Sequence, residues 1–143
     1  MRSVVNDALR GLDTIGSQLK DRAKTLKQLE QEKSEALAEA WKEFETKHKE
    51  HLEVFVRPEG KTFWSQSPRL RDRLGDLSRN LDGAFQAPTQ AQRTYFSELK
   101  ADYAQAIDAV NAFFNQSSED LNKALAAENI PPLMLPKSIG DKP

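Results

Sequence analysis

The chain has 143 residues, 38% hydrophobic and 30% charged, a length and composition typical of one folded domain. Its 21 Lys and Arg residues nearly balance its 22 Asp and Glu residues, which argues against a nucleic-acid binder because such a protein needs a basic surface to displace counterions. Cysteine is absent, which excludes disulfides, thiolate catalysis and cysteine-based metal sites. The sequence has no run of about 20 apolar residues, the length of a membrane span, and its first 30 residues lack a secretory signal.

Residues from about 3 to 56 are expected to form one long amphipathic helix, because their apolar residues stand mostly three or four positions apart. These residues are Val5, Leu9, Leu12, Ile15, Leu19, Ala23, Leu26, Leu29, Ala36, Leu37, Ala40, Trp41, Phe44, Leu52 and Phe55. A continuous helix of about 50 residues would be about 75 Å long, more than the width of a compact domain of this size. We therefore expect the half from Leu9 to Leu29 to lack a partner in its own chain, which favours packing on another domain or on a second copy.

Residues 57–67 contain a proline, a glycine and no periodicity, and are expected to connect two helices. The second helix, short and spanning about 68–86, is predicted to begin with Ser67 as N-cap and Pro68 at its first position. Its apolar stripe consists of Leu70, Leu74, Leu77, Leu81 and Phe85.

A third helix, again long, is predicted over about 90–129. Thr89 and Gln92 have the spacing of a capping box at its start, and Pro131 and Pro132 prevent it from continuing. Its stripe runs through Phe96, Leu99, Tyr103, Ile107, Val110, Phe113, Phe114, Leu121 and Leu125, and its aromatic members are expected in the core against the stripes of the other helices. In the tail, residues 130–143, we expect the trio Leu133, Met134 and Leu135 to dock on the bundle.

No segment alternates apolar and polar residues with period two, so the sequence predicts an all-α protein. The simplest arrangement is an elongated antiparallel hairpin of the two long helices, with the short helix packed across one end. The chain is expected to be a single helical domain.

The two histidines, His48 and His51, stand one turn apart, and Glu45 precedes His48 by three residues. A carboxylate-bridged di-iron bundle needs a second Glu-x-x-His from another helix, which the sequence does not contain. We therefore interpret both histidines as solvated or as lying at the edge of the apolar stripe. The sequence also lacks a phosphate-binding glycine loop and a nucleophile with a neighbouring base. We expect no catalytic, cofactor or metal site, and hence no enzyme activity of this chain.

A basic and aromatic patch stands out between the first and second helices. Its members are Arg57, Lys61, Phe63, Trp64, Arg69 and Arg73. Rings that stack and guanidinium groups that bind carboxylates or phosphates are typical of a surface for sugars, anions or a protein partner. The same residues also fit a structural interpretation, in which the rings tie the connection to the bundle and the arginines are solvated. The sequence leaves both interpretations open.

Residues 67 to about 133 resemble the C-terminal helical region of bacterial sortilin-like β-propeller proteins, often labelled BNR-repeat or glycosyl-hydrolase-like. The residues that carry the resemblance are Pro68-Arg69-Leu70, the leucines from Leu74 to Leu81, the turn Ala87-Pro88-Thr89, and Phe114-Asn115 followed by Leu121. They cover under half of the chain. The resemblance implies that this chain is a C-terminal piece of a longer, exported protein, periplasmic or extracellular, whose glycan-related activity belongs to the propeller.

The sequence thus leads to a non-catalytic helical accessory module that packs on an upstream domain or on a second copy of itself, a homodimer. Two alternatives stay open. The patch around Trp64 and Arg69 can complete a substrate or glycan groove on a neighbouring propeller, or the chain can be a free-standing adaptor that binds another helix.

Overall fold

The computed structural model describes residues 2–28, 34–58, 67–84 and 86–135. The helices are α1 (Arg2–Gln28), α2 (Glu35–Phe55), α3 (Leu70–Asp82), α4 (Gln90–Ala112), the π-helical turn η2 (Phe113–Ser117) and α5 (Ser118–Ala127). The described residues contain no strand, which confirms the all-α class. None of the helices described is both long and apolar enough to cross a bilayer.

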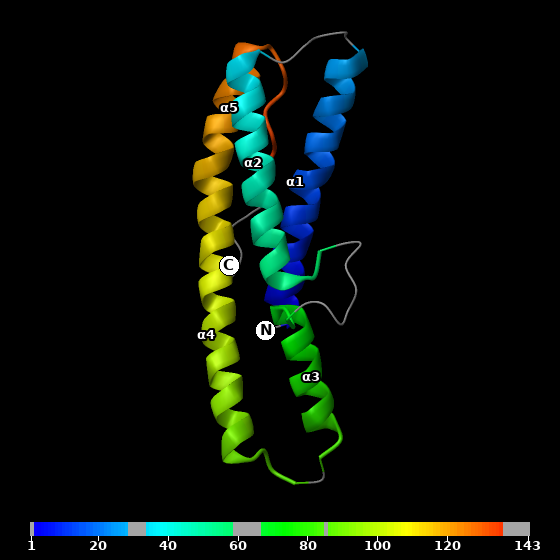
Figure 1. Cartoon of the computed structure of the whole chain (residues 1–143), viewed down its shortest axis with the longest axis vertical. Helices are drawn as coiled ribbons and strands as arrows, with labels where there is room; N and C mark the ends of the chain where they lie inside the picture. Colours follow the sequence, from blue (N-terminus) through cyan, green and yellow to red (C-terminus); the bar gives the residue numbers. More distant parts are fainter. Residues whose placement is uncertain (1, 29–33, 59–66, 85, 136–143) are drawn as a thin grey trace.

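The expected single helix over about 3–56 is wrong, because the chain forms two antiparallel helices there, α1 and α2 (Figure 1). Ser34 caps the start of α2, where its Oγ accepts a hydrogen bond from the Leu37 backbone N–H at 3.3 Å. The apolar spacing pauses just before this cap, since residues 30–35 are all polar. A polar interval of that length leaves nothing to hold a continuing helix against the core, and the chain can reverse there.

The reversal buries the first half of the predicted long helix within its own chain. The buried side chains of α1 are Ala8, Leu12, Ile15, Leu19 and Leu26. They pack against α2 and α4, so the expectation that Leu9 to Leu29 lacks an intramolecular partner is wrong. The excess length that favoured self-association through this stripe does not exist in the folded chain.

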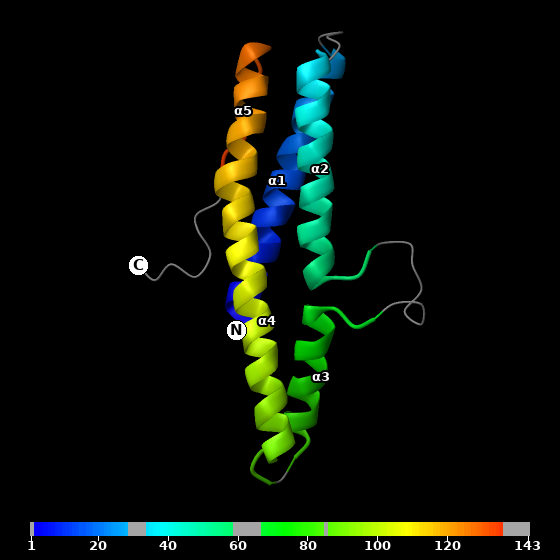
Figure 2. The same cartoon turned by 60° about the vertical axis from the view of Figure 1, so that its left-hand side comes forward.

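The molecule divides into a body and an arm along one continuous helix, α4–η2–α5 (Figures 1 and 2). The body contains α1, α2 and residues 104–127, with α2 antiparallel to the other two helices. The arm contains α3 and residues 90–103, side by side and antiparallel. Helix α3 therefore continues the line of α2 along α4 instead of packing across one end, as the sequence suggested.

Helix α3 begins two residues later than predicted, at Leu70, and ends earlier, at Asp82. Its N-cap is Arg69 rather than Ser67, because the Asp72 carboxylate accepts the Arg69 backbone N–H at 3.0 Å and closes the first turn. The start of α4 confirms the predicted capping box: Thr89 accepts from Gln92 N at 3.2 Å, and Gln92 Oε1 accepts from Thr89 N at 2.8 Å.

The π-helical turn η2 lets two consecutive aromatic residues enter the core. Phe113 and Phe114 are both buried, with ring centroids 5.9 Å apart, and Phe113 lies 4.8 Å from the Phe44 ring of α2. The wider turn changes the helical register, so that Ser118 and Leu121 also face inward. Ser118, buried in a core of apolar side chains, donates its hydroxyl to the Phe114 carbonyl, which satisfies the hydroxyl.

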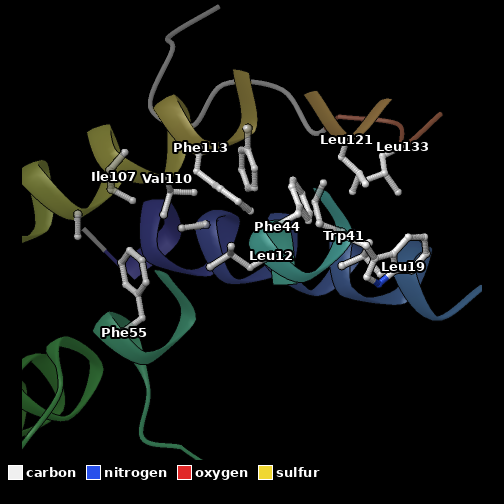
Figure 3. Close-up of a cluster of buried hydrophobic side chains, with 14 of the residues drawn as sticks. Leu12, Leu19, Trp41, Phe44, Phe55, Ile107, Val110, Phe113, Leu121 and Leu133 are labelled. Carbon is white, nitrogen blue, oxygen red and sulfur yellow. The ribbon is translucent and has the colours of Figure 1, made fainter. Parts of the chain in front are cut away.

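Buried side chains form one layer along the body (Figure 3). Leu12, Phe44 and Phe113 meet near its centre, and Trp41 and Leu121 lie toward the α5 end. Truncation of a fully buried ring such as that of Phe44 is typically worth about 3–5 kcal/mol of stability. Phe96 departs from the predicted aromatic core, because its side chain lies on the arm and is 42% exposed.

The tail follows α5 back along the body, and only part of the predicted apolar trio docks. Leu133 is buried and lies beside Leu121 (Figure 3). Met134 and Leu135 are 76% and 44% exposed. Docking of the trio is therefore correct for Leu133 alone.

Tyr103 joins α4 to the start of α3, and its replacement gives a pH-dependent prediction. Its buried hydroxyl donates to the Leu70 carbonyl at 2.6 Å, and burial raises the pKa of Tyr103 to about 12. The unfolded chain loses this proton near pH 10, so stability present below pH 10 is lost as the pH rises toward 12. Tyr103→Phe should cost about 1 kcal/mol at pH 7, the net value of one buried hydrogen bond, and abolish this alkaline loss.

Urea unfolding at pH 7, 10 and 11 measures both effects. Tyr95→Phe is the matched control, because it keeps Tyr103 and should keep the steeper alkaline loss of the wild type. An identical alkaline loss in Tyr103→Phe and the wild type would contradict the prediction.

Candidate interaction surfaces

The structure splits the predicted basic and aromatic patch. Arg57, Arg69 and Arg73 lie where α2 ends and α3 begins. Lys61, Phe63 and Trp64 fall outside the described residues, so their part in the patch stays a prediction.

Arg57 binds the first turn of α3. Its Nε donates to Asp72 Oδ2 at 2.8 Å, and its side chain is only 16% exposed. The same carboxylate oxygen accepts the Arg69 backbone N–H, near the positive end of the helix dipole. Arg57 thus connects the end of α2 to the beginning of α3, and it is not the solvated arginine that the structural interpretation of the patch expected.

Arg73 is also held by its own chain. Its Nη1 donates to Asp102 Oδ2 at 2.8 Å, and its Nε donates to the Tyr95 hydroxyl at 3.2 Å. The guanidinium carbon lies 5.5 Å from the centre of the Tyr95 ring, within cation–π range. The hydrogen bonds to Tyr95 and Asp102 raise the pKa of Arg73. Arg73 therefore fastens α3 to α4.

Arg69 borders an open depression between α2, α3 and α4, whose lining includes Val54, Arg73, Asp102 and Ala106. Its Nε is buried and has no hydrogen-bond partner in the part of the chain that the structure describes. Within the described patch, this depression is the part still open to an external contact. The other two arginines bind carboxylates of their own chain.

The histidines lie at the edge of the apolar stripe rather than in solvent. His48 Nε2 is 2.7 Å from the Leu12 carbonyl of α1, and both histidine side chains are half-buried. The imidazole packs close to Gly16, where an added Cβ would stand 3.4 Å from His48 Cε1, an ordinary van der Waals contact. His51 lies 4.9 Å from the Phe113 ring.

Glu45, the carboxylate of the Glu-x-x-His step, accepts a hydrogen bond from Trp41 Nε1 at 2.9 Å. Over residues 2–28, 34–58, 67–84 and 86–135, no group of three or more His, Cys, Asp or Glu side chains is placed to hold a metal ion. His48 thus connects α2 to α1, and His51 connects α2 to η2.

The exposed ring of Phe96 is a surface feature that the sequence did not reveal. Arg93 and Lys100, three residues before it and four after it, flank the ring on the same side of α4 and are exposed. Periodicity places Phe96 on the apolar stripe but does not show which parts of that stripe another helix covers. The only available signal was that the predicted short helix is too small to cover a long one.

Replacing Asp72 should separate α3 from α2. Asp72→Ala removes the acceptor of both Arg57 Nε and Arg69 N, and should cost about 1–3 kcal/mol because hydrogen bonds to a charged group are lost. Asp76→Ala, which breaks an exposed pair with Arg79, is the control and should cost less than about 1 kcal/mol. Urea unfolding measures the stability of both variants. Equal losses of unfolding free energy in Asp72→Ala and Asp76→Ala would contradict the prediction.

His51 should make the protein less stable in acid. Burial lowers the pKa of His51, so the unfolded chain takes up this proton at a higher pH than the folded chain does. Stability present above about pH 6.5, the ordinary histidine pKa, is therefore lost as the pH falls through the lower folded pKa. His51→Gln should unfold with a shallower pH dependence between pH 7 and 5 in thermal melts. A variant with the wild-type slope would contradict this.

No protein-family model, no curated protein and no solved structure matches this chain. The resemblance of residues 67–133 to the sortilin-like C-terminal region stays a hypothesis.

Proposed function

We propose that this chain is a non-catalytic helical interaction module whose arm packs against an amphipathic helix with acidic flanks. That helix belongs to a neighbouring domain or to another protein. The observation that carries the proposal is the exposure of Phe96 on an apolar stripe that is otherwise buried.

The stripe of α4 continues from the body into the arm, where Leu99 and Tyr103 are buried but Phe96 is not. Phe96 and Ile107 are 11 residues apart, which places them within about 20° on the helix surface and about 16 Å apart along the axis. Ile107 is 8% exposed, in the part of α4 that faces α1 and α2 (Figure 3). Phe96, in the arm, is 42% exposed, and α1 begins near the middle of the molecule (Figure 1). Among the described residues, no third helix packs beside the arm at Phe96.

Helix α3 buries only part of the apolar surface that the arm presents. Leu70 and Leu77 are buried, whereas Leu74 and Leu81 are only half-buried. Two helices in one layer cannot cover both sides of their shared stripe, and a third helix in the groove between them completes the packing, as α1 does in the body. The arm thus fits the apolar face of a helix.

The charged residues around Phe96 indicate which kind of helix fits the arm. The residues three and four positions from Phe96 are Gln92, Arg93, Leu99 and Lys100, two of them basic and none acidic. A helix that seats apolar residues on Phe96 would meet both basic side chains at its edges, so Asp and Glu flanks complement it. A second copy of this chain would bring like charges together, which disfavours a homodimer through this face.

This proposal keeps the accessory module inferred from the sequence and moves its contact from the first helix to the arm. The neighbour is either a domain of the same longer chain, as the sortilin-like resemblance implies, or a separate protein. The glycan-contact alternative has less support, since Arg57 and Arg73 already bind Asp72 and Asp102.

Site-specific photo-cross-linking tests the proposal. Phe96 is replaced by p-benzoylphenylalanine in the full chain, in cells that make the protein, and the cross-linked peptides are sequenced by mass spectrometry. Thr94, exposed on the opposite side of α4, carries the probe in the control. We expect position 96 to cross-link at least five-fold more than position 94, to a helical segment rich in Asp and Glu.

A charge reversal strengthens the test. Lys100→Glu should lower the yield from position 96 several-fold, because it repels the acidic flank. Cross-links between two copies of the chain, or equal yields at positions 94 and 96, would contradict the proposal.

A further inference from the structure

The segment after α5 is turned back along the body by a helix-ending motif. Asn129 has a φ of 58°, in the left-handed region, and its N–H donates to the Ala126 carbonyl at 3.1 Å. The Ile130 N–H donates to the Leu125 carbonyl at 2.9 Å, and both of these side chains are buried. These two hydrogen bonds define a Schellman motif. It directs residues 130–135 into the space between α1 and α5.

Helices α1 and α5 diverge toward the C-terminal end of α1, and the tail runs between them in contact with both (Figures 1 and 2). Side chains of both helices line this space and reach the tail. Two apolar residues three positions apart, Ile130 and Leu133, are 4% and 3% exposed and fix the segment in this α1–α5 groove.

Two side chains of α1 bind the main chain of the tail. Arg22 donates from Nε to the Pro131 carbonyl at 3.1 Å and from Nη2 to the Pro132 carbonyl at 3.2 Å. The Gln18 amide accepts from Met134 N at 2.6 Å and donates to the Met134 carbonyl at 2.9 Å. None of these contacts depends on the side chain of the tail residue.

Asn122 of α5 completes the set from the opposite wall. Its Oδ1 accepts from Leu133 N at 2.7 Å, and its Nδ2 donates to the Leu133 carbonyl at 3.4 Å. Pro131 and Pro132 have no N–H group, so every main-chain donor and acceptor from the Pro131 carbonyl to the Met134 carbonyl is bound by a side chain. The prolines also restrict φ, which lowers the entropy lost when an extended segment is held.

We propose that the α1–α5 groove is a binding site for extended, proline-containing peptides, and that residues 130–135 occupy it as an intramolecular ligand. The groove selects a main chain in extended form, an apolar residue at each end of a three-residue step, and prolines between them. This is the chemistry by which other proteins recognise proline-rich or extended segments. The site is separate from the arm and goes beyond the function proposed for it.

The tail is held in a way that permits exchange. Its contacts come from side chains of α1 and α5, Met134 and Leu135 point largely to solvent, and the Gln18 and Arg22 contacts are exposed. A tethered segment competes at an effective concentration in the millimolar range, so a free peptide binds the wild type weakly. Weakening the tail at one position should therefore open the site to a peptide from outside.

The experiment uses the full chain and the labelled peptide acetyl-ENIPPLML-amide, the sequence of residues 128–135. Leu133→Ser removes the buried anchor of the tail, and Met134→Pro removes the N–H that Gln18 binds without altering any buried side chain. Fluorescence anisotropy measures peptide affinity. We expect both variants to bind the peptide at least ten-fold more tightly than the wild type does.

Matched controls identify the groove. In the Met134→Pro background, Asn122→Ala should weaken peptide binding at least five-fold, whereas Asn80→Ala, an exposed asparagine of α3, should leave it unchanged. A peptide with serine in place of its first leucine, the counterpart of Leu133, should bind at least ten-fold more weakly.

Three results would overturn the proposal. One is that Met134→Pro, folded by circular dichroism, binds no peptide more tightly than the wild type. Another is that Asn122→Ala and Asn80→Ala bind equally. The third is a wild-type dimer in light scattering whose tails exchange between copies, which would assign the groove to a second copy of this chain. Because none of these results depends on Phe96, failure here is distinguishable from failure of the arm proposal.

Discussion

The apolar stripe of the continuous helix α4–η2–α5 is the surface on which the rest of the structure depends. Helix α3 packs along its first half and α2 along its second, and α1 and the tail cover the remaining side of the body. A stripe of this length drifts around a regular helix, and the π-helical turn corrects the register so that Phe113, Phe114 and Leu121 all face the same core. The buried hydrogen bond from Ser118 to Phe114 satisfies a polar group at this turn.

Both candidate surfaces arise where this long helix is incompletely covered. Helix α1 begins near the middle of the molecule (Figure 1), so the described part of the arm has two helices, and Phe96 there is exposed. At the other end α1 leans away from α5, and the tail fills the gap through Leu133 and the side-chain amides of Gln18 and Asn122. The surface of the arm is an apolar face bordered by basic residues, which suits a helical partner. The α1–α5 groove has polar side chains at its edges, which bind a main chain.

The all-α class, the start of α4 and most of the buried residues could be predicted, because they follow from spacing and capping chemistry close in the sequence. The reversal between α1 and α2 was missed because a continuous helix and a helical hairpin satisfy the same three- and four-residue steps. The signals were Ser34 and the polar interval of residues 30–35. Exposure of Phe96, the ion pairs of Arg57 and Arg73, and the main-chain contacts of Gln18 and Arg22 depend on residues far apart in the sequence, which periodicity does not report.

The body, the exposed arm and the α1–α5 groove all depend on the antiparallel packing of α1 and α2. A distance between spin labels measures it directly, because the chain contains no cysteine and Asp13 and Lys49 are exposed on α1 and α2. These residues neighbour Leu12 and His48, which are in contact, so Asp13→Cys and Lys49→Cys should give a distance of about 10–20 Å, typical of packed helices. A continuous helix would place the labelled backbone positions about 54 Å apart, and a distance near that value would show that α1 and α2 do not pack antiparallel.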